Sequence, residues 1–176
     1  VIILGSHSYV EPDFVRLNVE TLEKTGADCV GGRIETMSHT VLGKVASLAM
    51  SSSFGVGNAR FRTSDKPGFV DTVAFGAYRC EVFDRIGYFD EELVRNQDDE
   101  FNFRLTRGGG RIYLEPAIRS SYFSRPTLKA LWKQYFQYGR WKVCILRKHG
   151  SLPSVRHLVP ATALVAGRSP SHVETA

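Results

Sequence analysis

Apolar runs alternate with segments of helical periodicity along the first 115 residues. Residues 1–4 are all apolar and predict a buried strand, which Gly5 ends. A helix is predicted at residues 12–26, because Pro12 and Asp13 favour a helix start and Gly26 a helix end. A short strand is predicted at residues 28–32. A strand, a helix and a strand in this order indicate an α/β fold.

The same alternation continues through the middle of the chain. The pattern predicts a helix at residues 41–52, a strand at 70–78 and a short helix at 81–86 that Gly87 ends. The glycines within residues 55–61 predict a turn rather than a phosphate-binding loop. The acids at residues 90–92 are expected to be solvated, and a strand is predicted at 111–114, after three consecutive glycines.

The longest helical pattern lies between Pro126 and Gly150. Its apolar positions keep roughly helical spacing and are Leu128, Leu131, Trp132, Tyr135, Tyr138 and Ile145. Another face contains the bases Lys129, Lys133, Arg140 and Arg147. Two interpretations stay open: an ordinary amphipathic helix, or a membrane-surface helix whose polar face also closes over an anionic substrate.

The distribution of charge adds a class of partner to this picture. The net charge is +5, but residues 1–115 contain 13 basic and 17 acidic residues, and the remainder contains ten basic residues and one acid. Such a basic segment predicts a phosphate-bearing partner, which is a nucleic acid, a nucleotide diphosphate or an anionic membrane surface. No part of the sequence resembles a nucleic-acid-binding module, so nucleic acid is not expected.

Cysteine usage and the remaining composition exclude further classes. Cys29, Cys80 and Cys144 are odd in number and far apart, which favours free thiols in a reducing compartment over disulfides or a zinc site. No apolar run approaches the roughly 18 residues of a membrane span. Residues 161–176 have the composition of a disordered tail.

The candidate chemistry lies in a predicted helix that opens with three acids. Asn96 is the expected N-cap, and Asp99 occupies the third helical position, where the acid of a capping box belongs. Asp98 lies at the positive end of the helix dipole, which predicts a carboxylate that is ionised at neutral pH and suited to act as a general base. The alternative is that acids simply favour the first turn of a helix.

Several motifs in order resemble the inverting family-2 glycosyltransferases of the GT-A fold. One block is similar to the family's Glu-Asp-x-(Asp/Glu)-Leu-x-x-Arg motif, with Gln97 in place of Glu: Gln97-Asp98-Asp99-Glu100-Phe101-Asn102-Phe103-Arg104. Residues 137–141 are similar to the Gln-x-x-Arg-Trp motif of membrane-associated members. Residues 75–79 and 86–92 also resemble family signatures, and residues 55–62 and 70–73 resemble bacterial exopolysaccharide enzymes of the succinoglycan-biosynthesis type.

The resemblance implies roles for individual residues. Asp98 would be the catalytic base, which takes a proton from an acceptor hydroxyl as that oxygen attacks a nucleotide-sugar and inverts its anomeric carbon. The substrate-binding residues that it implies are Asp99, Glu100, Arg104, Gln137, Arg140 and Trp141. Arg140 and Lys142 are expected to supply positive charge for the leaving diphosphate.

The resemblance also implies a divalent metal, Mg²⁺ or Mn²⁺, held partly by an Asp-x-Asp or Asp-x-His motif at the end of a strand. The matching place is Gly5-Ser6-His7. His7 is retained as a metal ligand, whereas Gly5 replaces the first Asp of the motif. Loss of that carboxylate weakens the expected metal site.

The implied architecture is a partial GT-A (Rossmann-like) α/β domain with a C-terminal amphipathic interface helix. Residues 1–126 would be the acceptor-side part of the catalytic domain, residues 127–160 a membrane-interface helix region and residues 161–176 the tail. The family's nucleotide-binding half, which precedes the metal motif, has no counterpart in the sequence, so the chain is expected to be a fragment.

The expected activity is transfer of a hexose from a nucleotide-sugar, UDP-glucose, to a lipid-linked saccharide acceptor in exopolysaccharide synthesis. The expected location is the cytoplasmic face of the bacterial inner membrane. The alternative is a truncated, non-catalytic fragment that binds a membrane surface or a protein partner. Gly5 and the missing half favour this alternative for the chain on its own.

Overall fold

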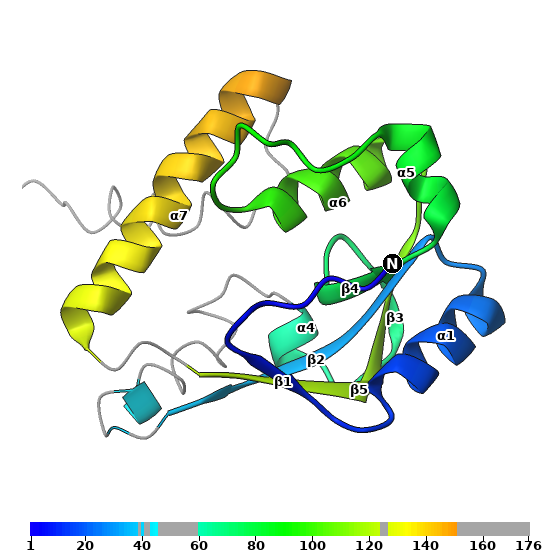
Figure 1. The fold of residues 1–176 in the computed structure, drawn as a ribbon, viewed down its shortest axis with the longest axis horizontal. Helices are drawn as coiled ribbons and strands as arrows, with labels where there is room; N and C mark the ends of the chain where they lie inside the picture. Colours follow the sequence, from blue (N-terminus) through cyan, green and yellow to red (C-terminus); the bar gives the residue numbers. More distant parts are fainter. Residues whose placement is uncertain (39, 41–42, 46–59, 124–126, 151–176) are drawn as a thin grey trace, which may run out of the picture.

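The computed structural model describes residues 1–38, 40, 43–45, 60–123 and 127–150. These residues form a curved mixed sheet with helices on both of its faces (Figure 1). The strands are β1 (Ser8–Val10), β2 (Cys29–Met37), β3 (Gly68–Val70), β4 (Ala74–Tyr78) and β5 (Ile112–Phe123). The helices are α1 (Phe14–Thr25), α4 (Arg60–Thr63), α5 (Cys80–Ile86), α6 (Gln97–Arg107) and α7 (Leu128–His149).

The two long strands, β2 and β5, form the centre of the sheet. The strand order is β1-β5-β2-β4, and β3 also pairs with β5. Strands β2 and β5 run parallel, from Cys29 opposite Ile112 to Met37 opposite Phe123, whereas the other pairings are antiparallel. Parallel strands are typically covered on both faces, and the first four residues of β2 are buried.

A bulge bends the sheet in the middle of this parallel pair. Gly31 lies opposite Leu114 and Arg33 opposite Arg119, so residues 115–118 of β5 face the single residue Gly32. A Cβ atom on Gly32 would collide with the backbone carbonyl of Ile118, and glycine is therefore needed for this close approach. The bulge also accommodates Pro116, which has no N–H to give to a ladder.

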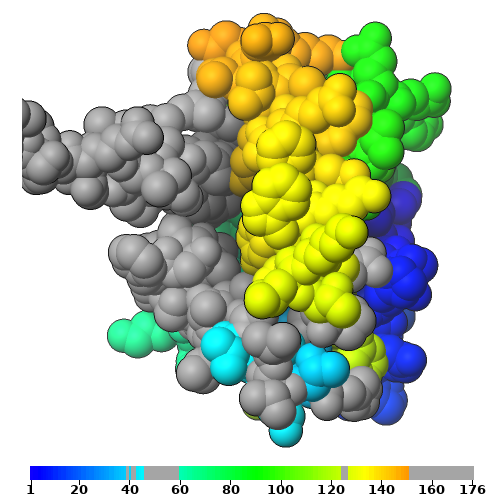
Figure 2. Space-filling view, turned by 90° about the vertical axis from the view of Figure 1, so that its left-hand side faces the viewer, coloured from blue at the N-terminus to red at the C-terminus, as the bar shows by residue number. Residues whose placement is uncertain are grey.

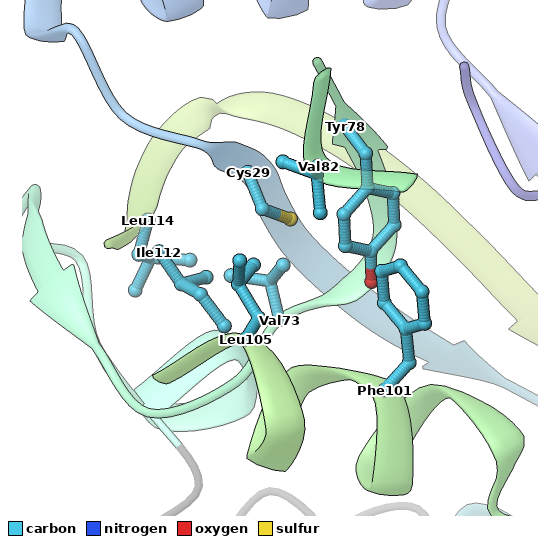
Figure 3. Close-up of a cluster of buried hydrophobic side chains, with 8 residues drawn as sticks. All are labelled: Cys29, Val73, Tyr78, Val82, Phe101, Leu105, Ile112 and Leu114. Carbon is cyan, nitrogen blue, oxygen red and sulfur yellow. The ribbon is translucent and has the colours of Figure 1, made fainter. Parts of the chain in front are cut away.

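The core has two parts, one on each face of the sheet. Cys29 and Val30 are neighbours on β2, and their side chains point to opposite faces. Cys29 packs against apolar side chains of α5 and α6 (Figure 3). The residues of this cluster are Cys29, Val73, Tyr78, Val82, Phe101, Leu105, Ile112 and Leu114. Val30 packs with Phe14 of α1 on the other face. The two apolar faces of the sheet thus fix the positions of α1 and α6.

Three predicted helices are confirmed with their ends. Helix α1 ends at Gly26, which has φ = 61° in the left-handed region, and α5 ends at Gly87. Helix α7 starts at the cap residue Thr127, whose hydroxyl accepts from the Ala130 N–H at 3.2 Å, and ends at Gly150 in the left-handed region. Local capping signals were sufficient to predict these boundaries.

The strand predictions were less accurate. Residues 1–4 do not form a buried strand: Val1 and Leu4 are 58% and 48% exposed, although the Tyr78 N–H donates to the Val1 carbonyl along the edge of β4. The predicted strand at residues 70–78 is divided between β3 and β4, and the predictions at 28–32 and 111–114 were too short. Pairing between distant segments, which local pattern does not encode, sets these lengths.

Some predictions fall outside the described residues. The predicted helix at 41–52 and the loop at 55–61 lie largely outside them, and the tail at 161–176 lies wholly outside them. Within the described part of the chain, no helix combines the length and the apolar character that crossing a bilayer requires. The described structure confirms the expected partial Rossmann-like α/β architecture.

Candidate active site

The loop before α6 brings this helix against α7. Asn96 precedes the helix with φ = 61°, and its side chain makes no capping hydrogen bond. Instead, the Asn96 Nδ2 donates to the backbone carbonyl of Tyr138 in α7 at 3.1 Å. The predicted capping role of the Asn96 side chain was therefore wrong, because a tertiary contact uses the amide. This bond places the start of α6 beside the middle of α7 (Figure 1).

Asp98 lies in the first turn of α6 with an exposed side chain. Desolvation by the surrounding protein and, next, the charge of Asp99 raise the pKa of its carboxyl to about 6. Hydrogen bonds from the backbone N–H groups of Asp99 and Asp98, and the charge of Lys142, act in the opposite direction. The Asp98 carboxyl thus has many protein atoms around it, which raise its pKa, and still contacts water.

The direction of this shift is opposite to the one expected from the helix dipole alone. The dipole and the N–H groups favour the charged form, but the loss of water and the adjacent Asp99 outweigh them. A carboxyl with a pKa of about 6 is still mostly ionised at pH 7. The prediction that Asp98 is ionised at neutral pH therefore agrees with the structure. The predicted reason, a pKa lowered by the helix dipole, does not agree, because the pKa is raised.

Asp99 faces a cation from α7. The Lys142 Nζ lies 3.4 Å from the Asp99 Oδ2, and the two side chains are 27% and 25% exposed. Among the described residues, Asp98 has no ion-pair partner, whereas Asp99 and Glu100 both do. The three consecutive acids of α6 thus have three different environments.

Glu100 is buried, with 1% of its surface exposed, and its carboxylate lies between the Arg104 guanidinium and the His149 imidazole. The Arg104 Nε and Nη2 donate to its two oxygens at 2.7 and 3.0 Å, and the His149 Nε2 lies 2.9 Å from Oε1. Arg104 also donates to the carbonyls of Ile86 and Tyr88. Glu100 and Arg104 thus use their polar groups in contacts within the protein. Their expected role in binding substrate stays a prediction, and these internal contacts do not support it.

The Gln-x-x-Arg-Trp segment lies on α7, where Gln137, Arg140 and Trp141 fall within about 100° of one another, as their spacing predicted. Tyr138 and Lys142 face α6, and Arg140 lies two residues from each of them, about 200° around the helix. Arg140 is exposed, and Gln137 and Trp141 are partly buried. The structure therefore brings Tyr138 and Lys142 to the acids of α6 and points Arg140 away from them.

His7 lies in an exposed turn directly before β1. In the described part of the chain, no group of three or more His, Cys, Asp or Glu residues could hold a metal ion. The donor set around His7 does not fit a divalent cation, because Gly5 offers no carboxylate. The metal ligand expected from the resemblance is not supported by these residues.

Sequence analysis did not identify two residues that the structure connects to this region. His149 lies against the buried carboxylate of Glu100, and Arg62 of α4 interacts electrostatically with three tyrosines of β5 and α7. The only sequence signal for His149 is its spacing of seven residues from Lys142, which places both on the same face of α7. Arg62 had no such signal, since its neighbours come from distant segments.

Fold and site together define an α/β domain with a solvent-open carboxyl at a helix start beside a basic helix. No protein-family model matches the sequence. The chain is 29% identical over 160 residues, 91% of its length, to the succinoglycan biosynthesis protein ExoA of Rhizobium meliloti, and this covers 48% of that protein.

A second similarity extends over nearly the same part of the chain. Over 153 residues, 84% of the chain and 47% of the relative, the sequence is 32% identical to a protein of Methanococcus voltae. That protein is named as a dolichyl N-acetyl-α-D-glucosaminyl phosphate 3-β-D-2,3-diacetamido-2,3-dideoxy-β-D-glucuronosyltransferase. The chain thus spans about half the length of the curated relatives it matches. Its similarity to these two proteins supports a relationship to a glycosyltransferase family.

Proposed function

We propose that the chain is the acceptor-side part of an inverting glycosyltransferase, which transfers a hexose from UDP-glucose to a lipid-linked oligosaccharide in exopolysaccharide synthesis. The named relatives support sugar transfer and saccharide synthesis. The motif resemblance supports UDP-glucose as the donor, a lipid-linked oligosaccharide as the acceptor and inversion at the anomeric carbon. The observation that carries the proposal is Asp98, an acid of α6 that is open to water, forms no ion pair within the described residues and has a pKa raised to about 6.

In the proposed reaction Asp98 is the general base. A hydroxyl oxygen of the acceptor attacks the anomeric carbon of the donor from the side opposite the diphosphate. The bond from that carbon to the diphosphate oxygen breaks, its electron pair leaves with the nucleoside diphosphate, and the hydroxyl proton passes to the Asp98 carboxylate. A base with a pKa of about 6 accepts a proton more readily than one with the ordinary value of 3.8.

The departing diphosphate gains negative charge, which a fixed cation stabilises. Lys142 is better placed for this role than Arg140, because Lys142 faces the acids of α6 and Arg140 lies about 200° away around α7. The ammonium of Lys142 already lowers the pKa of Asp98, so it acts on the proposed base and on the leaving group from one position.

Replacement of the proposed base tests this function. In the protein expressed from its complete reading frame, Asp98→Asn should lower the rate of sugar transfer about a hundredfold or more, because the amide cannot accept the proton. The readout is glucose transfer from UDP-glucose to a lipid-linked acceptor. Asp84→Asn, which removes an exposed acid on α5, is the matched control and should keep full activity. Undiminished turnover of Asp98→Asn in a folded protein would refute the base.

An anionic membrane surface, at the cytoplasmic face of the bacterial inner membrane, is the proposed partner of α7. Leu128, Trp132 and Phe136 follow one another at intervals of four residues and are 60%, 68% and 60% exposed. Lys129 and Lys133 are exposed beside them. Exposed aromatic and basic residues on one side of a helix are typical of helices that lie in a membrane interface.

The same surface supports the alternative of a non-catalytic membrane-binding or protein-binding module. The two functions differ in the expected behaviour of Asp98→Asn. A binding module would keep its partner and show no turnover before or after the substitution. The glycosyltransferase would lose turnover and keep its partner.

A further inference from the structure

Arg62 of α4 is a partly buried guanidinium whose charge has no carboxylate partner among the described residues. Its Nη1 donates to the Thr36 Oγ1 at 2.9 Å, and its Cζ lies 5.5 Å from the centre of the Phe61 ring. The segments outside the described residues contain a single acid, Glu174. A desolvated cation without a counter-ion is costly in a protein, so an anionic group that bonds this guanidinium would be favoured.

Three tyrosines contribute to the electrostatic environment of this guanidinium. Thr36 of β2, the acceptor from Arg62, lies opposite Tyr122 in the register of β2 and β5. The hydroxyls of Tyr122, Tyr135 and Tyr138 are close enough to interact electrostatically with Arg62. Helix α4, strand β5 and helix α7, which are far apart in the sequence, therefore contribute to one cluster.

Gln134 connects two of the tyrosines and leaves their protons available. Its Nε2 donates to the hydroxyl oxygen of Tyr122 at 3.2 Å and to that of Tyr138 at 2.7 Å. Because each hydroxyl accepts a bond here, its own proton can be donated to a third group. The buried Oε1 of Gln134 has no hydrogen-bond partner in the described structure. The cluster therefore offers a guanidinium and hydroxyl donors, together with one amide acceptor that needs a donor.

The ionisation of these groups is consistent with the binding of an anion. Burial lowers the pKa of Arg62, but a guanidinium remains charged throughout the physiological range. Burial also raises the pKa of Tyr135, so its hydroxyl stays protonated and able to donate. Guanidinium and hydroxyl groups are typical donors to phosphate oxygens.

We propose that Arg62 and the hydroxyls of Tyr122, Tyr135 and Tyr138 bind a phosphoryl group of a glycosyl phosphate. The phosphoryl oxygens accept from these four donors, and a sugar hydroxyl supplies the missing donor to the Gln134 Oε1. Tyr138 lies one helical turn before Lys142, so this Arg62 site adjoins the acids of α6. The glycosyl group and the carrier of the phosphate, a nucleotide or a lipid, rest on the proposed function.

Equilibrium binding tests the site on the protein expressed from its complete reading frame. Inorganic pyrophosphate is the first probe, measured by titration calorimetry. Arg62→Met should weaken its binding about tenfold or more, because it removes charge-assisted hydrogen bonds, and Tyr138→Phe should weaken it several-fold. Arg62→Lys should recover part of the affinity. Arg147→Met, which removes an exposed cation of α7, is the matched control and should stay within about twofold.

UDP and a short-chain polyprenyl phosphate then distinguish the two sources of the phosphate. A loss of UDP affinity in Arg62→Met assigns the site to the donor, and a loss of polyprenyl phosphate affinity assigns it to the acceptor. Equal pyrophosphate affinity of Arg62→Met and the parent, or an equal loss in Arg147→Met, would overturn the site, provided that circular dichroism shows each variant to be folded. Pyrophosphate binding that needs Arg62 in a protein without transferase activity would refute the proposed function and retain the site.

Discussion

Neighbouring carboxyls of α6 differ because each has different neighbours in space. Asp98 is open to water, Asp99 lies 3.4 Å from the ammonium of Lys142, and Glu100 is buried against Arg104 and His149. Successive residues of a helix point about 100° apart, so three acids in sequence face three environments. In the proposed mechanism only the first of them is available for chemistry.

The charge of Lys142 should set the acid limb of the activity profile. Asp98 must be ionised to act as a base, so activity should fall as the pH falls through about 6. Lys142 lowers the pKa of Asp98, while Asp99 and the desolvation raise it. Lys142→Met should therefore move the acid limb of kcat/KM to higher pH by about 0.5–1 unit, as measured from pH 4.5 to 9.

Two further variants distinguish the effect of the Lys142 charge on the acid limb from the effect of its packing. Lys142→Arg should restore the acid limb, and Arg147→Met, on an exposed side of α7, should not move it. The groups that face Asp98 in the described structure are Asp99, Lys142 and the hydroxyl of Tyr78, whose pKa is raised partly by Asp98. An unchanged acid limb of kcat/KM in Lys142→Met would show that the Lys142 ammonium does not affect the pKa of Asp98.

At the scale of elements, α7 is joined to α6 mainly by polar and charged contacts. Its inner face contributes Ile145, which is buried, and His149, which contacts Glu100. Lys148 bonds Asp90 at 2.7 Å and Glu92 at 2.9 Å, and the hydrogen bond from Lys148 lowers the pKa of Asp90. The expectation that all three acids at residues 90–92 are solvated was wrong for Asp90, whose side chain is 12% exposed.

Removal of Arg104 should destabilise this α6–α7 contact. Arg104→Met leaves the buried Glu100 carboxylate with His149 as its one remaining partner among the described residues. Breaking a buried ion pair in this way costs about 3 kcal/mol of unfolding free energy, which urea denaturation would measure.

A nearby arginine on the same helix provides the control for this measurement. Arg107→Met removes only a hydrogen bond of 3.4 Å to the His149 carbonyl and a cation–π contact at 5.9 Å from the Phe103 ring. Its cost should stay within about 1 kcal/mol. Equal costs for the two variants would show that the Glu100 cluster adds little to stability.

At the scale of the whole molecule, helix α7 presents basic and apolar side chains together to solvent. Helix α7 lies across the face shown in Figure 2, where its first half is drawn in yellow. Leu128, Trp132 and Phe136 are exposed, although Leu128 and Trp132 belong to the apolar positions that the sequence predicted for this helix. These three side chains face solvent, while Gln134, Tyr138 and Lys142 contact the rest of the protein.

Vesicle sedimentation should detect binding through the proposed membrane-facing side of α7. The protein should bind vesicles that contain phosphatidylglycerol more tightly than vesicles of phosphatidylcholine, and salt should weaken this binding. The double variant Lys129→Gln/Lys133→Gln should lose about thirtyfold in affinity, at about 1 kcal/mol per lysine. Lys24→Gln, on α1, should bind like the parent. Equal binding to neutral vesicles would contradict the electrostatic part of the proposal.

Much of the helical framework was predictable, because caps and periodicity are local. Asp13, Gly26, Thr127 and Gly150 delimit α1 and α7 through bonds within a few residues of each helix end. The length of β5 was not predictable, since it depends on its parallel pairing with β2 and on the bulge that Gly32 permits. A local pattern contains no information about a partner about 80 residues away, as the pairing of Cys29 with Ile112 illustrates.

The candidate site divides in the same way. The sequence by itself determined which acids occupy the first turn of α6 and which residues share α7, because a helix sets the direction of each side chain from its position. Only the tertiary structure decided that Glu100 is paired and buried, that Lys142 rather than Arg140 faces the acids, and that Arg62 interacts electrostatically with three tyrosines. Desolvation and Coulomb interactions depend on distances in space, and chain folding creates those distances.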